Sequence, residues 1–275
     1  MEVKVLGPLE AQEHGRSVVP TAGKPRQILA LLALEAGQVV TVPTLIEELW
    51  GMQPPRSALT TLQTYILHLR RLIEAALATN GGGDAKDVLA TRCGGYQLNL
   101  AGGVDVHEYE RLAAQGARAP EVGDFEGASR LLRSALAVWR GKVLVDVQVG
   151  PRLAIEVIRF EESKLSVMEM CIDADLRLGR HYSLLSELAR LNAHYPMHEN
   201  VCAQFMLALY RSGQQWRALE AYKRLRDTLV TELGVEPSAR LQLLQRSILR
   251  SDAILHDTSA NGSRNGFRSP AVADR

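Results

Sequence analysis

The segment from Arg56 to Leu72 carries polar side chains of the types that contact phosphates and base edges. Its sequence, RSALTTLQTYILHLRRL, spaces apolar residues as in a helix. The other side of that helix would carry threonine, glutamine, histidine and arginine, without a carboxylate. Hydroxyls and amides hydrogen-bond to phosphates or bases, and arginine pairs bidentately with phosphate or with guanine O6 and N7. The segment therefore predicts a helix that lies on DNA.

This helix needs an apolar side that holds it on its domain. Pro54-Pro55 interrupts the chain before it, so the helix is predicted from near Ser57 to about Ala78. Its predicted apolar stripe is Leu59, Leu62, Ile66, Leu69 and Ile73, widened by Tyr65 and Leu72. A solvated surface helix has a similar pattern, so the neighbouring elements must decide between the two interpretations.

The predicted DNA contacts lie on this helix, just before it, in a later hairpin and in one earlier segment. The N-terminal half of the helix is expected to read bases, while Arg70 and Arg71 pair with phosphates or guanine. The full set is Lys24, Arg26, Arg56, Ser57, Thr60, Thr61, Gln63, Thr64, His68, Arg70, Arg71, Arg92 and Tyr96.

The placement of charge supports this prediction more than the amount of charge does. The chain has 32 Lys+Arg and 31 Asp+Glu, a formal net charge of +1, so no overall basic field marks a nucleic-acid partner. Between Glu48 and Glu74, however, there is no acidic residue, while three arginines lie in that interval. A carboxylate on a contact face would repel the phosphate backbone, so this sorting favours a local DNA-binding surface.

The elements around the helix predict an α+β domain, a winged helix-turn-helix. Two apolar-rich runs joined at Gly94-Gly95 are typical of a hairpin, which would form the wing. In chain order the predicted elements are short strands within residues 2–19, a helix from about Pro25 to Ala36 capped by Thr21, a helix that follows the cap Thr41 and stops at Gly51, the helix already described, and a hairpin of Val88 to Arg92 and Tyr96 to Leu100.

From Val104 onward the pattern is helical and contains a repeat of 34 residues, the length of a tetratricopeptide repeat. Gly179, Tyr182, Leu185 and Leu188 recur as Gly213, Trp216, Leu219 and Tyr222, and Gly123 begins a looser earlier copy. Stacked helix pairs would bury one continuous core. We therefore predict a DNA-binding domain at 1–103, an all-α tetratricopeptide-like domain at 104–250 and a disordered tail at 251–275, whose composition is polar.

The same sequence gives little support for an enzyme, a metalloprotein or a membrane protein. The seven histidines and the three cysteines, Cys93, Cys171 and Cys202, form no ligand-spaced cluster, and no nucleophile-elbow pattern occurs. There is no GxxxxGK[ST] phosphate loop, so neither a cofactor nor nucleotide-driven switching is expected. The apolar runs are too short to span a bilayer, and the N-terminus lacks a signal-peptide pattern. The expected location is the cytoplasm, in association with the nucleoid.

Ordered motifs in both halves resemble the Streptomyces antibiotic regulatory proteins over about residues 2–250. In the first half these are Leu49-Trp50-Gly51, Pro54-Pro55, Thr61-Leu62-Gln63-Thr64-Tyr65, Leu69-Arg70-Arg71-Leu72 and Gly95-Tyr96. In the second half they are Val104-Asp105-Val106 with Tyr109, Trp139-Arg140-Gly141, the run from Asp173 to Arg180, the run from Leu207 to Gly213 and the run from Glu232 to Pro237.

The resemblance implies an OmpR-type winged helix followed by a bacterial transcriptional activation domain. It further implies a homodimer on direct repeats of promoter DNA near the −35 element, which recruits RNA polymerase holoenzyme through its sigma or alpha subunit. Helix contacts would carry over to Thr61, Thr64 and Arg71, with Arg70 near the backbone and Arg92 in the wing. A role of the C-terminal domain in contact between protomers on DNA predicts that truncation after Gly103 leaves monomeric binding but abolishes activation. The alternative is a tetratricopeptide-type scaffold without specific DNA binding.

Overall fold

The computed structural model of the chain describes residues 1–78, 82–252 and 255. The predicted tail at 251–275 therefore lies almost entirely outside the described residues. Contacts divide the chain into two compact units. The first comprises Met1–Gln115 and Leu131–Met168, and the second comprises Gly116–Arg130 with the described residues from Glu169 onward.

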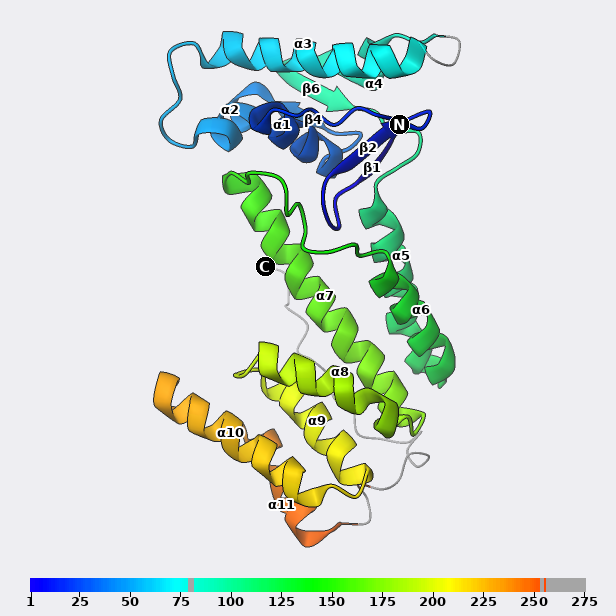
Figure 1. The fold of residues 1–275 in the computed structure, drawn as a ribbon, viewed down its shortest axis with the longest axis vertical. Helices are drawn as coiled ribbons and strands as arrows, with labels where there is room; N and C mark the ends of the chain where they lie inside the picture. The colour runs from blue at the N-terminus through cyan, green and yellow to red at the C-terminus, as the bar shows by residue number, and fades with distance from the viewer. Residues whose placement is uncertain (79–81, 253–254, 256–275) are drawn as a thin grey trace. The chain divides into compact units, whose positions relative to one another are not determined.

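The first unit contains two small antiparallel sheets with helices around them (Figure 1). One sheet has the strand order β1-β2-β3 and the other β4-β6-β5. Three helices and a hairpin follow the first sheet, as predicted, so the winged helix-turn-helix fold is confirmed. These elements are β1 (Glu2–Lys4), β2 (Glu10–Glu13), β3 (Arg16–Ser17), α1 (Gly23–Leu34), β4 (Val39–Thr41), α2 (Val42–Trp50), α3 (Ala58–Leu77), α4 (Ala85–Val88), β5 (Leu89–Arg92) and β6 (Gly95–Leu98).

Some local details differ from the sequence prediction. The Thr41 side chain does cap α2, because its Oγ1 accepts a hydrogen bond from the Thr44 amide at 3.3 Å. Thr21 does not cap α1, whose N-cap is Ala22 without a side-chain hydrogen bond. Strand β4 was not predicted, since its three residues are held by antiparallel pairing with β6, more than 50 residues away. Helix α4, a single turn before the hairpin, was also not predicted.

A buried carboxylate connects α2 to the start of α7 (Pro151–Arg177), a helix divided between the two units. Glu48 in α2 is only 2% exposed. Its Oε1 accepts hydrogen bonds from the Gln27 side-chain amide at 2.8 Å and the Gly150 amide at 2.6 Å. Its Oε2 accepts from the amides of Arg152 and Leu153 at 2.8 and 3.2 Å. The first amides of a helix lack intrahelical partners and attract negative charge, so Glu48 caps α7.

The N-terminal strand region is attached in the same way to residues that follow the predicted domain boundary. Asp105, the first residue of α5 (Asp105–Arg118), accepts hydrogen bonds from the amides of Val5 and Leu6 at 2.9 and 3.0 Å. Burial raises the pKa of the Asp105 carboxyl, and these main-chain bonds oppose the shift. The Arg140 amide in turn donates to the Leu6 carbonyl at 2.8 Å. A fragment that ends at Gly103 would lose all of these partners. The structure therefore argues against the expectation that such a fragment folds and binds DNA as a monomer.

Replacing Glu48 by alanine should destabilise the protein by about 3 kcal/mol, because several buried donors would lose their acceptor together. Thermal or urea unfolding monitored by circular dichroism measures this. The matched control is Glu47→Ala, since Glu47 is only partly buried and its carboxylate pairs with the exposed Arg152 at 3.3 Å. That variant should change stability by less than about 1 kcal/mol. Equal effects of the two substitutions would contradict the capping role of Glu48.

The second unit is helical. It contains the remaining parts of α5, α7 and α6 (Phe125–Ala137), a short 3₁₀ helix, η2, and four further helices. The glycines that mark the predicted repeat all adopt left-handed conformations between helices, with φ values of 79° at Gly123, 75° at Gly179 and 74° at Gly213. The added elements are η2 (Ala119–Val122), α8 (His181–His194), α9 (Glu199–Arg211), α10 (Gln215–Leu233) and α11 (Ala239–Arg250). An all-α second region with a repeated pattern is thus confirmed.

The repeat has the predicted period, but its buried face differs from the predicted one. Tyr182 and Trp216 are 67% and 69% exposed, and Leu219 is only partly buried. Between α8 and α10, the pairs 34 residues apart in which both residues are buried are Leu184 with Ala218 and Leu191 with Leu225. On α8 the buried residues Leu184, Leu188 and Leu191 follow the i, i+4, i+7 spacing of one helix face.

Leu188 has no exposed surface, so Leu188→Ala should cost roughly 2–5 kcal/mol by leaving a cavity. Leu243→Ala is the matched control, because Leu243 is 58% exposed on α11 and should be nearly neutral. Denaturant unfolding of both variants measures the difference. A Leu188→Ala protein as stable as wild type would show that this face does not form the core of the second unit.

Candidate nucleic-acid interface

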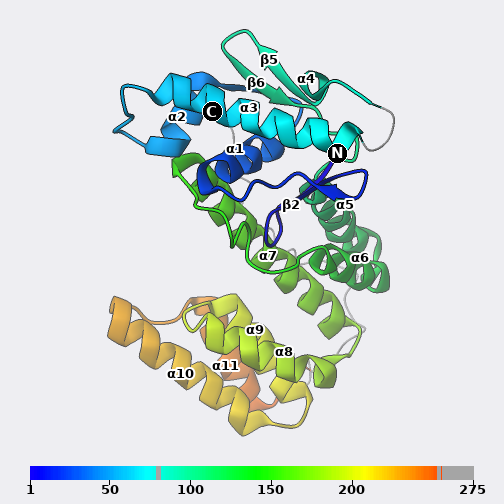
Figure 2. The same cartoon turned by 45° about the horizontal axis from the view of Figure 1, so that its top comes forward.

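Helix α3 lies on the outside of the first unit, and the hairpin β5–β6 lies beside it (Figure 2). Its predicted polar face is exposed, and the first carboxylate along the helix is Glu74. Thr61 is an exception, because it is only partly exposed and therefore lies at the edge of this face. The predicted contact residues that are exposed on α3 or just before it are Arg56, Ser57, Thr60, Gln63, Thr64, His68 and Arg71.

The buried side of α3 differs from prediction at one leucine. Its buried residues are Ala58, Leu62, Ile66, Leu69, Ile73 and Ala76. Leu59, predicted to belong to the stripe, is 50% exposed, and Ala58 is buried at the start of the helix instead. A second leucine, Leu67, is 49% exposed within the polar face, where only polar residues were predicted.

The two consecutive arginines of α3 have different environments. Arg70 is partly buried, and its guanidinium donates to the Leu89 carbonyl through Nε at 3.0 Å and Nη2 at 2.8 Å. Nη2 also donates to the Thr91 hydroxyl at 2.7 Å. These bonds attach the first strand of the wing to α3. Arg71, one residue later, is exposed on the polar face. Arg70 therefore positions the wing, and Arg71 is the arginine presented to a partner.

The wing is held against the rest of the domain by its second strand. In β6, Tyr96 pairs with Val40 of β4 and with Thr91 of β5. The Tyr96 side chain is buried, with 8% of its surface exposed, so it packs inside the unit rather than on the wing surface. A Cβ at Gly95 would lie 2.2 Å from the Val40 carbonyl oxygen, which explains why glycine is required there.

The turn of the hairpin presents Arg92 and Cys93 to solvent. Arg92 Nε donates to the Gln97 side-chain oxygen at 2.7 Å, and Gln97 Nε2 donates to the Gly37 carbonyl at 2.6 Å. Through these hydrogen bonds, Gln97 of the neighbouring strand β6 orients the Arg92 guanidinium. Arg92 thus remains a candidate contact, and Gln97 is a supporting residue that the sequence did not single out.

The geometry does not place Lys24 and Arg26 in this interface. Lys24 Nζ donates to the Leu49 carbonyl at 3.0 Å and lies 4.3 Å from the centre of the Trp50 ring. Burial lowers the pKa of the Lys24 ammonium. Arg26 donates to the Pro20 carbonyl at 3.1 Å and pairs with Asp146 at 3.0 Å. Since both cations have internal partners, we leave them out of the proposed interface.

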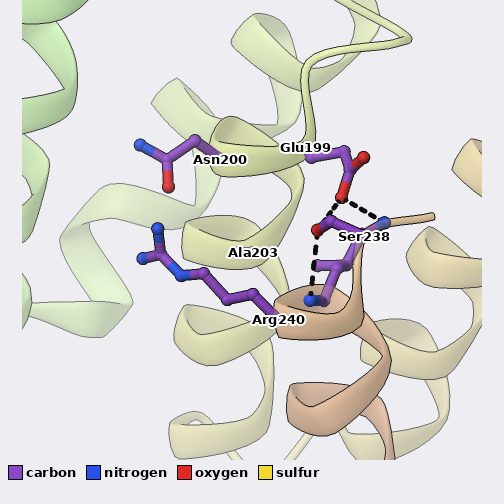
Figure 3. A pocket seen from close by; sticks show the side chains of 6 residues that line it. Glu199, Asn200, Ala203, Ser238 and Arg240 are labelled. Atoms are coloured by element: carbon purple, nitrogen blue, oxygen red, sulfur yellow. Dashed lines mark hydrogen bonds between the residues drawn. The ribbon is translucent and has the colours of Figure 1, made fainter. Parts of the chain in front are cut away.

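The second unit contains a small pocket lined by residues of α9 and α11 and by Ser238, which precedes α11 (Figure 3). It has a volume of about 200 Å³ and lies between the starts of α9 and α11. Within it, Glu199 accepts hydrogen bonds from the amide and the hydroxyl of Ser238, and the Ser238 hydroxyl accepts from the Leu241 amide at 3.5 Å. These groups cap α11 and satisfy one another, so the pocket has a structural explanation.

Comparisons with known proteins match both halves of the chain to regulatory families. Residues 16–98 match the family of C-terminal domains of transcriptional regulatory proteins, and residues 104–249 match the bacterial transcriptional activator domain. The chain is 56% identical over 274 residues to the regulatory protein DnrI of Streptomyces peucetius, covering 99% of this chain and 98% of DnrI. The chain belongs to the Streptomyces antibiotic regulatory proteins.

Other relatives of this antibiotic regulatory family agree with that result. The transcriptional regulator RedD of Streptomyces coelicolor is 36% identical, with 94% of this chain and 73% of RedD covered. A solved structure of Mycobacterium tuberculosis EmbR in complex with a low-affinity phosphopeptide is similar, with a TM-score of 0.83 and 32% identity. That match covers 91% of this chain and 65% of EmbR. Among the described residues, no helix is long and apolar enough to cross a membrane.

The three cysteines should differ sharply in reactivity, because only the thiolate form is alkylated quickly. Burial raises the pKa of the Cys202 thiol to about 12, so at pH 8 this thiol is protonated as well as covered. Cys93 in the wing is exposed. Iodoacetamide at pH 8, followed by mass spectrometry of peptides, should label Cys93 in the folded protein and Cys202 only after unfolding. Comparable labelling of both in the folded state would contradict the described packing of α9.

Proposed function

We propose that this protein is a sequence-specific DNA-binding transcriptional activator, and not an enzyme, and that it controls a secondary-metabolite gene cluster. The observation that carries the proposal is the exposed, carboxylate-free face of α3 beside the wing. Thr60, Gln63, Thr64, His68 and Arg71 supply hydroxyl, amide, imidazole and guanidinium groups on that face. These are the groups that hydrogen-bond to base edges and phosphates.

In the proposed complex, α3 enters the major groove, which is wide enough for an α-helix. The exposed polar residues of its first half, Thr60, Gln63 and Thr64, contact bases, and Arg71 binds a phosphate or a guanine. The wing then brings Arg92 to an adjacent phosphate or to the minor groove. Arg70 keeps these two parts in register through its bonds to β5. This assignment modifies the sequence prediction, in which Thr61 and both arginines faced the DNA directly.

We further propose that two copies bind direct repeats overlapping the −35 element and recruit RNA polymerase holoenzyme through its sigma or alpha subunit. Copies arranged in tandem on one face of the duplex require half-sites one helical turn apart, about 10 bp, or a multiple of it. Family membership supports this part of the proposal. A regulator of this kind must reach chromosomal DNA. We therefore also propose that the protein is located in the cytoplasm, in association with the nucleoid.

Arg71→Ala should weaken binding to the selected promoter sequence by about tenfold and should reduce the dependence of log K on log salt by about one, because one counterion-releasing contact is lost. Fluorescence anisotropy titrations at several salt concentrations measure both quantities. The matched control is Arg190→Ala, which removes the same charge from an exposed position on α8 and should leave both quantities unchanged.

Two results would contradict the proposal at different levels. If Arg71→Ala binds with wild-type affinity and salt slope, α3 does not present this face to DNA. If the wild-type chain shows weak binding without sequence preference, the scaffold alternative is favoured, since a specific regulator prefers its site by several orders of magnitude.

A further inference from the structure

The exposed side of α3 between Thr60 and Arg71, called here the reading face, contains one residue with an apolar side chain. Leu67 is 49% exposed, although the buried side of α3 is already complete without it. Every other exposed residue between Thr60 and Arg71 is polar. Single exposed leucines are common on protein surfaces. The position of Leu67 in the middle of this polar face is the feature that needs an explanation.

Helix geometry places Leu67 at the centre of the reading face. At roughly 100° per residue, Leu67 lies about 60° from Thr64 on one side and about 60° from Arg70 on the other. Arg70 is bonded to the wing, so the orientation of Leu67 relative to the wing is fixed. Arg71 follows one turn later on the same side of the helix. A duplex that touches both the wing and Thr64 would therefore meet Leu67 between them.

A leucine side chain has no hydrogen-bond donor or acceptor, so it cannot read the polar edges of bases. The one apolar group in the major groove that distinguishes base pairs is the C5 methyl group of thymine. We propose that Leu67 contacts a thymine methyl group and is a specificity-determining residue. This inference rests on the proposed DNA-binding function, and it adds a thymine within the stretch of the operator read by α3.

The test uses the full chain and a duplex selected by it from a random library. Each thymine of the selected sequence is replaced in turn by deoxyuridine, which keeps the hydrogen-bonding edge and lacks only the methyl group. Binding constants are measured for wild type and for Leu67→Ala. Leu59→Ala serves as the matched control, because Leu59 is 50% exposed on the same helix but lies two turns earlier. Circular dichroism melting checks that each variant folds.

For wild type, loss of the contacted methyl should weaken binding by about fourfold at one or two positions, the factor that corresponds to about 0.8 kcal/mol per buried methyl-sized group. Leu67→Ala should bind the thymine and uracil duplexes equally at that position, whereas Leu59→Ala should keep the wild-type difference. The inference is overturned if wild type tolerates uracil everywhere, or if Leu67→Ala keeps the full difference. Failure to select any sequence would instead overturn the proposed function, and this inference with it.

Discussion

The buried carboxylate of Glu48 is the contact on which the arrangement of the first unit depends. Removing a carboxylate from water is costly, and at 2% exposure Glu48 recovers that cost only through its hydrogen-bond donors. Those donors come from α1, from the residue before α7 and from the first turn of α7. The helix-turn-helix and the N-terminal part of α7 are therefore parts of one packed unit. The support of the DNA-binding domain extends beyond residue 103.

A second polar contact determines how the proposed reading face is presented. The Arg70 guanidinium donates hydrogen bonds to Leu89 and Thr91 of β5, and these bonds fix the distance between α3 and the wing. A winged helix binds DNA through two separate parts, and binding is strongest when their spacing needs no adjustment. By holding the wing, Arg70 leaves the exposed face between Thr60 and Arg71 to hydroxyl, amide, imidazole and guanidinium groups and to Leu67. Positioning and reading are thus performed by neighbouring residues of the same helix.

Much of this architecture could be predicted from local sequence patterns. Helical periodicity and breakers such as Pro54-Pro55 and Gly51 located α2 and α3, and the 34-residue spacing located the glycines of the second unit. Strand β4 could not be predicted, because its short sequence becomes a strand only through pairing with β6. The buried face of α8 was predicted correctly at Leu188 but not at Tyr182, because a period alone does not say which residues face inward.

The individual roles within the candidate site were less predictable than its location. Arg70 and Arg71 are identical side chains in adjacent positions. Arg70 holds the wing because the Leu89 carbonyl lies within reach of its guanidinium, whereas Arg71 is exposed. Lys24 and Arg26 looked like phosphate contacts because their acceptors, Leu49 and Asp146, are distant in sequence. Leu67 was missed because it belongs neither to the predicted apolar stripe nor to the polar residue types expected to contact DNA. Long-range partners determine the roles of Arg70, Lys24 and Arg26.

A structure of the protein bound to its selected duplex would test the central claim most directly. The account predicts α3 in the major groove, with the face from Thr60 to Arg71 against the bases and Arg92 at the backbone or minor groove. The Arg70 guanidinium should remain bonded to β5. A complex in which the exposed face of α3 points away from the DNA, or in which the contacts come from the second unit alone, would contradict it.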